Sequence, residues 1–377
     1  MRIIQAVYCL GRGGAERLTL DITRELHSRQ DIEVKLVSFG KSVDYEYDTS
    51  GLDYVYCPTI PEISVLNPNK PVFSTAFADL VNDFKPDIIH SHLYKTEIIT
   101  RGISYPKAKW FSHCHDNMKP FQNFGLNNFS SKRNFTNFLE KRFLFHRYKL
   151  NGGNRFLAIS KDTQAYFERT APDFPTTLFP NAIDFQKFFI DRNSCETGTK
   201  LILVNTGNFA EKKNQIFFIK LAEVLRTRNI DFEIHLLGDG GLRESVTEAV
   251  RKNGLEQNII LHGNVSNVAE FLQNASIYLH SATYEPLGLV LIEAMASGLP
   301  VVTLDGKGNR DLIIQGKNGF MLFEHDAEKF ADAVLVIWND KTKYKEMSAF
   351  AQEFARQYDI KAYIDRLLVL YQNALML

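Results

Sequence analysis

The feature that most constrains this chain is a regular alternation of short apolar runs with amphipathic stretches. Ile3–Val7 is typical of a buried strand, and Ala15, Leu18, Ile22 and Leu26 then recur at the spacing of one helix face. Further strand candidates in the first half are Val34–Ser38, Asp87–His90, Trp110–His113 and Phe156–Ile159. Strands that alternate with helices in this way predict a parallel sheet covered by helices on both faces.

The same alternation begins again near residue 200. The strands expected there are Leu201–Asn205, Glu233–Leu237, Ile259–Leu261, Ile277–Leu279 and Pro300–Leu304. The hydrophilic stretch 191–200 lies just before this restart and is interpreted as a linker. We therefore expect two Rossmann-like, doubly wound α/β domains, at 1–188 and 189–357, with a C-terminal helix at about 358–377 that packs back onto the first. Open parallel sheets bind ligands at the carboxyl ends of their strands, so two facing sheets predict an interdomain cleft.

Composition narrows the class of protein further. The chain has 377 residues, a length that suits two domains. Lys+Arg and Asp+Glu both number 44, which argues against a nucleic-acid binder. The four cysteines form no C-x-x-C pair, which favours a reducing compartment. The first apolar run is too short for a signal peptide, and no run reaches the roughly 20 apolar residues of a membrane span. We expect a cytoplasmic protein.

The strongest chemical signal is the run SATYEPLGLVLIEAMASGLP, residues 281–300. Glu285 ends a strand, and Pro286 suits an early helix position because it lacks an N–H. Gly288 allows a ligand to approach the backbone closely. The amides of Leu287, Gly288 and Leu289 are then expected to be unpaired donors at a helix start, ready for an anion.

Glu293 lies inside the helix expected after these residues. It is the only charged residue between Leu287 and Leu304, and a carboxylate in apolar surroundings is costly unless it has a partner. Helical side chains lean toward the N-terminus, so Glu293 leans toward the anion site. Ribose hydroxyls are suitable donors to it. The alternative is a structural glutamate that caps a nearby loop.

Glu285 and Glu293 are separated by seven residues and followed by the run AMASGLPVV. This arrangement resembles the E-x7-E signature of the retaining glycosyltransferases of family 4, which have the GT-B fold. The resemblance implies that Glu285 contacts the hydroxyls of the donor sugar and Glu293 the ribose. It also implies that the backbone of Pro286–Leu289 holds the sugar and the diphosphate, and that transfer needs neither a metal ion nor a cofactor.

A glycine-rich turn, GRGGAER, follows the first strand. Glycines at a strand-to-helix turn permit backbone approach to phosphate, although such a turn is often only a turn. It resembles the G-G-A-E-R turn of the same family. The resemblance implies that Gly13 and Gly14 border the diphosphate and that Glu16 lies on the acceptor side. Glu16 and Arg17 can instead form a solvated face.

The run NTGNFAEKKN follows the first strand of the second half. A lysine there can reach the diphosphate leaving group as a point charge. Lys213 and Asn214 match the family pattern G-R-[LF]-x-x-x-K-[GN], whereas Asn208 stands where the family commonly has arginine. This departure removes one cation from the phosphate site. It leaves open whether Asn208 contacts phosphate and whether Lys212 or Arg12 compensates.

Two H-x-H runs end strands of the first half: His90 and His92, then His113 and His115, followed by Asp116. Alternation along a strand puts both histidines of a pair on one face. A metal site is one interpretation, and packing within the sheet is another. The resemblance favours a third, in which His115 lines the donor-sugar pocket and Asp116 lies on the acceptor side. No D-x-D motif occurs near a strand end, which fits a metal-free transferase.

The resemblance also bears on the partners. The run HGNV resembles a loop that holds the nucleotide base through backbone atoms near Val265, and uridine is the commoner base in related enzymes. The acceptor implied is a saccharide or a lipid-linked saccharide in polysaccharide assembly. Residues 118–150 contain seven lysines and arginines and seven phenylalanines against one acid, Glu140. This segment is either a helix that docks on an anionic membrane surface or a core helix with a solvated basic face.

Three other classes of protein stay open. A nucleotide-sugar epimerase can share this architecture, and it would convert the donor without an acceptor. A metal hydrolase built on the paired histidines would be sensitive to chelators. A catalytically silent sugar-nucleotide binding module would turn over no donor.

Overall fold

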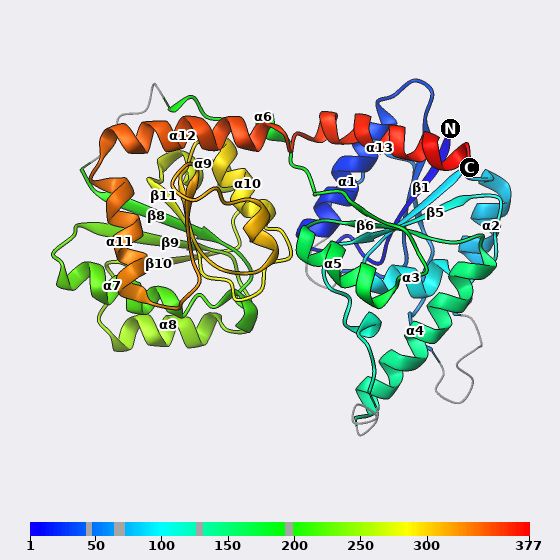
Figure 1. Cartoon of the computed structure of the whole chain (residues 1–377), viewed down its shortest axis with the longest axis horizontal. Helices are drawn as coiled ribbons and strands as arrows, with labels where there is room; N and C mark the ends of the chain where they lie inside the picture. Colours follow the sequence, from blue (N-terminus) through cyan, green and yellow to red (C-terminus); the bar gives the residue numbers. More distant parts are fainter. Residues whose placement is uncertain (43–46, 64–71, 126–130, 193–198) are drawn as a thin grey trace. The chain divides into compact units, whose positions relative to one another are not determined.

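The computed structural model describes residues 1–42, 47–63, 72–125, 131–192 and 199–377. They form two compact units (Figure 1). Unit 1 comprises Met1–Ala182 together with Ile360–Leu377, and unit 2 comprises Ile183–Asp359. Most of the expected linker, 193–198, lies outside the described residues, as do Cys195 and Phe129.

Unit 1 contains a seven-stranded parallel sheet of order β3-β2-β1-β4-β5-β6-β7. Its strands are β1 (Arg2–Val7), β2 (Glu33–Ser38), β3 (Tyr54–Tyr56), β4 (Ile88–His92), β5 (Lys109–Cys114), β6 (Arg155–Ala158) and β7 (Thr176–Leu178). The order reverses direction between β1 and β4, which makes that pair the switch point where such sheets bind ligands. The prediction of a parallel sheet is confirmed, although the short strands β3 and β7 were not expected.

Helices cover both faces of this sheet. They are α1 (Gly14–His27), α2 (Thr75–Phe84), α3 (Tyr94–Thr100), the 3₁₀ turn η1 (Lys119–Phe121), α4 (Lys132–Leu150), α5 (Lys161–Thr170) and α13 (Ile360–Leu375). One face packs against α1 and α13 through Leu18, Ile22, Tyr363 and Leu367. The other packs against α2 to α5, with Phe77, Leu144 and Phe167 in its core. The C-terminal helix α13 therefore packs on the same sheet that contains β1, the first strand of the chain.

Unit 2 contains a six-stranded parallel sheet of order β10-β9-β8-β11-β12-β13. Its strands are β8 (Leu201–Thr206), β9 (Phe232–Leu237), β10 (Ile259–Gly263), β11 (Ile277–His280), β12 (Val301–Leu304) and β13 (Gly319–Leu322). The switch point lies between β8 and β11. The loops that follow these two strands are therefore brought together at the carboxyl ends of the strands.

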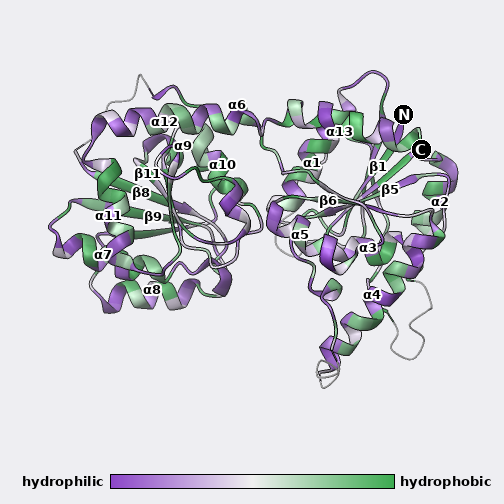
Figure 2. Ribbon diagram, in the orientation of Figure 1, coloured by the Kyte–Doolittle hydropathy of each residue, from purple (hydrophilic) through white to green (hydrophobic). Residues whose placement is uncertain are grey.

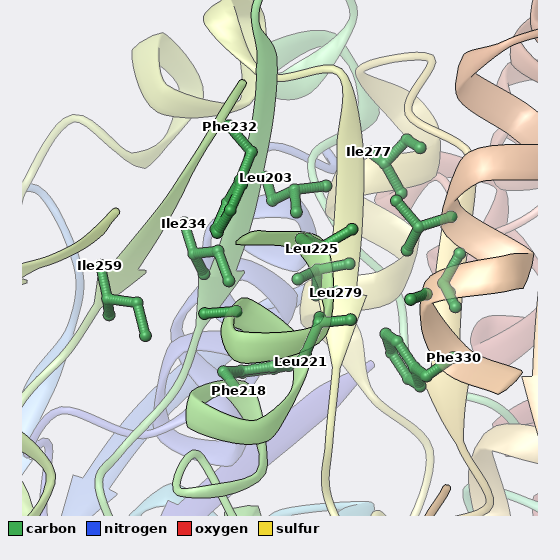
Figure 3. Packing of buried hydrophobic residues seen from close by; sticks show 14 of the residues in the cluster. Leu203, Phe218, Leu221, Leu225, Phe232, Ile234, Ile259, Ile277, Leu279 and Phe330 are labelled. Atoms are coloured by element: carbon green, nitrogen blue, oxygen red, sulfur yellow. The ribbon is translucent and has the colours of Figure 1, made fainter. Parts of the chain in front are cut away.

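The helical elements of unit 2 are α6 (Phe185–Phe188), η4 (Glu211–Lys213), α7 (Phe217–Thr227), α8 (Arg243–Lys252), α9 (Val268–Asn274), α10 (Leu289–Ala296), η5 (Gly308–Asp311), α11 (Ala327–Trp338) and α12 (Lys341–Arg356). Leu203, Ile234 and Leu279 of the sheet pack against Leu221 of α7 and Phe330 of α11 (Figure 3). The strands are mostly hydrophobic, whereas polar residues lie on the outer helix faces (Figure 2). Both predicted doubly wound units are therefore present.

No helix in the described part of the chain is both long and apolar enough to span a bilayer.

Candidate active site

The loops after β8 and β11 are held together by hydrogen bonds at the switch point of unit 2. The Ser281 hydroxyl donates to the carbonyl oxygen of Lys213 at 2.8 Å, and the Thr283 amide donates to that of Lys212 at 2.9 Å. Asn214, in the left-handed conformation at φ 53°, donates its side-chain amide to the Ser281 carbonyl at 3.3 Å. The turn that carries Lys213 is thus fixed against the loop that carries Glu285.

Glu285 and Lys213 form an ion pair beyond the carboxyl ends of β8 and β11. The Lys213 ammonium donates to Oε2 of Glu285, and Nε2 of His280 lies 3.0 Å from the same oxygen, although its N–H is not aligned as a full hydrogen bond. Burial alone would raise the pKa of Glu285, but Lys213 and His280 together hold that pKa well below its usual range. Glu285 is therefore ionised at neutral pH.

His280 is a site residue that the sequence did not single out. It ends β11 and is 1% exposed. Burial lowers its pKa, and the neighbouring Glu285 carboxylate opposes that shift only in part. A histidine five residues before Glu285 was the available signal, but its contact with the carboxylate depends on the fold of the intervening loop.

The start of α10 is built on Gly288. This residue is the N-cap of the helix, with φ at 100°, and no side chain caps it. A Cβ at Gly288 would lie 2.1 Å from Cδ1 of Leu291. Within the described residues no backbone acceptor takes the amides of Leu287, Gly288 or Leu289. An uncapped helix start with free amides is suited to bind an anion.

Pro286 and Leu287 link Glu285 to this helix start, and both are buried. The adjoining loop after β12 packs tightly against them, because a Cβ at Gly308 would lie 1.9 Å from the Pro286 carbonyl oxygen. The Glu285 amide donates to the carbonyl of Gly306 at 2.8 Å in the same loop. The backbone around the anion site is therefore held on two sides.

Glu293 is 2% exposed in the middle of α10. Burial raises the pKa of Tyr278, and the charges of Glu293 and then Glu285 add to the rise. Both carboxylates thus lie close enough to the Tyr278 phenol for their charges to act on it. The structure places Glu285 shortly before the helix start and Glu293 within the helix.

Asn208 and Val265 lie in neighbouring loops of unit 2. Asn208 is exposed, and its side-chain oxygen would be 2.0 Å from a Cβ at Gly240, so the side chain lies against the loop that follows β9. Val265 follows β10 and is half-buried.

In unit 1 the glycine turn leads directly into α1. Gly13 is the N-cap, and Gly14 begins the helix. A Cβ at Gly13 would lie 2.0 Å from Oε2 of Glu16, so the carboxylate of Glu16 fills the space that the glycine leaves. Burial raises the pKa of Glu16, and its hydrogen bond to backbone opposes that shift. Glu16 is thus part of the turn rather than a solvated side chain.

His90, His92, His113 and His115 lie together at the carboxyl ends of β4 and β5, and we call them the histidine stack. Neighbouring rings are near-parallel: the centroids of His90 and His92 are 4.4 Å apart, and those of His113 and His115 are 4.3 Å apart. Three of the rings are 0% exposed and His115 is 8% exposed. Asp116, the next residue, is half-buried. The expected common face is confirmed.

The histidine stack was also a candidate metal site. Among the described residues, His90, His92 and His113 form the one group whose ligating atoms lie within 4.8 Å of one another. Nδ1 of His92 is 3.0 Å from Nε2 of His115, and Nε2 of His92 is 2.8 Å from the side-chain oxygen of Gln5. Because both nitrogens of His92 are hydrogen-bonded, a metal ion would have to displace a partner, and the stack does not fit a ready-made three-histidine site.

Family models match nearly the whole chain. The model described as glycosyltransferase family 4 matches residues 12–187, and the model described as glycosyl transferases group 1 matches residues 186–354. The first covers most of unit 1, and the second covers most of unit 2, including Lys213, Glu285 and Glu293.

Curated relatives are glycosyltransferases. The chain is 26% identical over 177 residues to poly(ribitol-phosphate) α-N-acetylglucosaminyltransferase of Staphylococcus aureus, which is 46% of this chain and 36% of that protein. The chain therefore spans about a third of the length of that relative. It is 22% identical over 373 residues to UDP-Gal:α-D-GlcNAc-diphosphoundecaprenol α-1,3-galactosyltransferase of Escherichia coli, covering 95% of this chain and 93% of that protein.

Solved structures share the fold. HepE of Anabaena, in complex with UDP and glucose, superposes with a TM-score of 0.76 at 17% identity, covering 98% of this chain and 99% of HepE. Two parallel-sheet units, two consecutive family models and this likeness lead to one conclusion. The chain is a glycosyltransferase that belongs to family 4 and has the GT-B fold.

Proposed function

We propose that this enzyme transfers a sugar from a UDP-sugar to a saccharide or lipid-linked saccharide, with retention of anomeric configuration and without a metal ion. The observation that carries the proposal is the ion pair of Lys213 and Glu285 beside the uncapped start of α10. A cation, a row of amides and an ionised carboxylate at one sheet edge match the diphosphate and the hydroxyls of a nucleotide sugar.

The donor diphosphate is held by Lys213 and by the amides of Leu287, Gly288 and Leu289. A lysine ammonium has three donors, so Lys213 can bond to phosphate while it still neutralises Glu285. Donors that are already in place stabilise the negative charge that develops on the departing diphosphate. Oε2 of Glu285 faces Lys213 and His280, which leaves Oε1 to accept hydrogen bonds from the sugar hydroxyls.

Glu285 is a poor base because its pKa is held far below neutrality. The proton of the acceptor hydroxyl then passes to an oxygen of the leaving diphosphate. In that step the acceptor oxygen bonds to the anomeric carbon as the bond from that carbon to the diphosphate breaks. Attack from the face on which the diphosphate leaves retains the configuration.

The names of the similar proteins support the choice of donor and acceptor. HepE was solved with UDP and glucose, and the Escherichia coli relative is named for UDP-Gal and a diphosphoundecaprenol-linked acceptor. The Staphylococcus aureus relative is named for a poly(ribitol-phosphate) acceptor. These names favour a uridine nucleotide and an acceptor in polysaccharide assembly.

A donor screen tests the proposal. The enzyme is incubated with a panel of UDP-, GDP- and ADP-sugars and a lipid-linked saccharide, with and without EDTA, and the anomeric configuration of the product is read by NMR. We expect transfer from a UDP-sugar, an α-linked product from an α-linked donor, and equal rates with EDTA. Inversion, loss of activity with EDTA, or a new sugar isomer formed from donor alone would contradict it.

We further propose that α4 docks the enzyme on an anionic membrane surface near such an acceptor. The N-terminal end of α4 reaches beyond the other helices of its unit (Figure 1). Lys132 and Arg133 are exposed at this end, Arg142 is exposed further along the helix, and Phe135 is 37% exposed. Exposed cations beside an aromatic ring suit a surface of anionic headgroups.

Two cations of the same helix have structural roles instead. The Lys141 ammonium donates to the carbonyl of Phe121 at 2.9 Å, and Arg147 donates to the carbonyls of Arg101 and Gly102. The exposed set is therefore the one to change.

Vesicle flotation tests the docking. Wild-type protein is expected to float with vesicles that contain phosphatidylglycerol and to stay behind with pure phosphatidylcholine. A triple change of Lys132, Arg133 and Arg142 to Gln should abolish flotation, whereas Lys107→Gln together with Lys161→Gln, elsewhere on unit 1, should not. Equal recovery of wild type and triple variant from anionic vesicles would remove the proposal.

A further inference from the structure

A buried polar layer lies on the face of the unit 1 sheet that α1 and α13 cover. Around it this face is apolar, with Ile3, Ile88 and Phe111 on neighbouring strands. The layer consists of the histidine stack together with Gln5 of β1, Tyr371 of α13 and Asn181, which lies just before the border with unit 2. Buried polar groups are costly unless they are hydrogen-bonded, so the partners in this layer are informative.

Asn181 sets the direction of a hydrogen-bond chain. Its side-chain oxygen is 3.0 Å from Nε2 of His113, so that nitrogen carries a proton and donates. Its NH2 group is 3.3 Å from Nδ1 of His115, so that nitrogen carries a lone pair and accepts. In a neutral imidazole one nitrogen donates and the other accepts. His115 therefore has its proton on Nε2.

The other bonds follow from this assignment. Nε2–H of His115 donates to Nδ1 of His92 at 3.0 Å, and Nε2–H of His92 donates to the side-chain oxygen of Gln5 at 2.8 Å. The NH2 group of Gln5 donates to the Tyr371 hydroxyl at 3.1 Å, which donates to Nδ1 of His90 at 2.5 Å. One unbroken chain thus requires the Nε2–H tautomer in every ring of the histidine stack.

The same layer keeps its rings uncharged. Burial is the main cause that lowers the pKa of each of the four histidines, and their mutual repulsion lowers those of His90, His92 and His115 further. For His113 the pKa is about 3. The groups that contact His115 are His92 from β4, His113 from its own segment, and Asn181, and none of these three is a carboxylate. The charge of Asp116, the next residue, acts on Cys114.

We propose that Asn181 and His92 are positioning residues that hold His115 neutral, with its proton on Nε2, at the carboxyl end of β5. The part of this inference that concerns activity rests on the proposed function, in which His115 lies in the donor-sugar pocket. Positive charge develops on the sugar ring as its bond to the leaving group breaks. An uncharged ring beside it does not oppose that charge, whereas an imidazolium does.

Histidine-selective ¹⁵N NMR of the whole chain tests the tautomer without reference to activity. Ten histidines contribute signals, and a His115→Gln variant identifies the one that belongs to His115. The expected result is a protonated Nε2 and an unprotonated Nδ1, unchanged between pH 8 and pH 6. A signal with the proton on Nδ1, or an imidazolium in that range, overturns the proposal.

Asn181→Asp tests the positioning role, because it keeps the shape of the side chain and replaces the NH2 donor with an acceptor. Nδ1 of His115 then faces a carboxylate and takes up a proton, so the ring becomes a cation at neutral pH. We expect kcat to fall at least 10-fold at pH 7 with KM for the donor within 3-fold. The rate should then rise with pH as His115 loses the added proton, a dependence that the wild type lacks.

Asn151→Asp is the matched control. Asn151 is also buried in unit 1, where its NH2 group donates to the carbonyls of Ile103 and Arg147. This change should destabilise unit 1 and leave both the His115 signal and the pH profile as in wild type. The same pH-independent loss of rate in both variants, or full activity of Asn181→Asp with a charged His115, overturns the positioning role. Failure of the proposed function is a separate result, in which wild type transfers no sugar at all.

Discussion

At the scale of single residues, Glu285 carries the most specific prediction. Glu285→Gln removes the charge that Lys213 neutralises and weakens the acceptor for the sugar hydroxyls. We expect kcat/KM for the donor to fall on the order of 100-fold, as for removal of one preorganised polar contact in an active site. Initial rates with the preferred UDP-sugar measure this change in kcat/KM. Affinity for UDP alone should change little, because UDP has no sugar, and unchanged transfer would contradict the assigned role.

A change of Glu293 should affect nucleotide binding rather than contacts with the donor sugar. Glu293 is buried within α10 and proposed to accept hydrogen bonds from ribose. Glu293→Gln should weaken binding of UDP and of UDP-sugar alike, by about 10-fold, the size expected for hydrogen bonds to a charged group. Calorimetric titration with both ligands measures it. A loss confined to the UDP-sugar would assign Glu293 to the sugar instead of the ribose.

The sequence identified these residues by spacing and resemblance, but it could not identify their contacts. Lys213 and Glu285 are 72 residues apart and meet because β8 and β11 are neighbours at a switch point. His280 and Asn181 were not singled out for a role, since their partners are determined by the fold. Asn208, the departure from the family pattern, lies against Gly240.

At the scale of elements, the start of α10 depends on glycine at position 288. Gly288→Ala places a side chain at φ 100° and within 2.1 Å of Leu291, so we expect a loss of about 1–3 kcal/mol in the free energy of unfolding. Donor binding should fall with it, because the free amides move. Gly241→Ala is the control, since nothing lies within 4 Å of its added Cβ. Thermal unfolding of the two variants measures the difference, and equal melting temperatures would contradict the account.

The histidine stack predicts a pH dependence of stability. In the folded state the pKa of each ring lies below 6.5, whereas in the unfolded chain it returns to about that value. The unfolded chain thus binds more protons, so stability is full above pH 6.5 and falls as the pH drops. Each buried ring contributes up to about 1.4 kcal/mol per pH unit.

The unfolding of unit 1 can be followed by the fluorescence of Trp110, a buried residue of β5, in a Trp338→Phe background. Urea unfolding at pH 7.5 and pH 5.5 measures the change in unit 1. The carboxylates with lowered pKa, such as Glu285, act only below about pH 4.5 and do not interfere. Equal stability at the two pH values would contradict neutral, buried rings.

At the scale of the whole molecule, the alternation of strand and helix was enough to predict two doubly wound units. Ten strands were expected and are present. The missed strands β3, β7 and β13 are three or four residues long and lie at sheet edges, where few apolar side chains are needed. Strand order could not be predicted from the sequence, because it depends on where each crossover connection places the next strand in the sheet.

The most direct test of the whole account is a crystal structure of the enzyme with its nucleotide-sugar donor. We expect the diphosphate on the amides of Leu287–Leu289 with Lys213 beside it, the ribose hydroxyls on Glu293 and the sugar hydroxyls on Oε1 of Glu285. A nucleotide bound at another edge of the unit 2 sheet, or one whose ribose makes no hydrogen bond to Glu293, would contradict it.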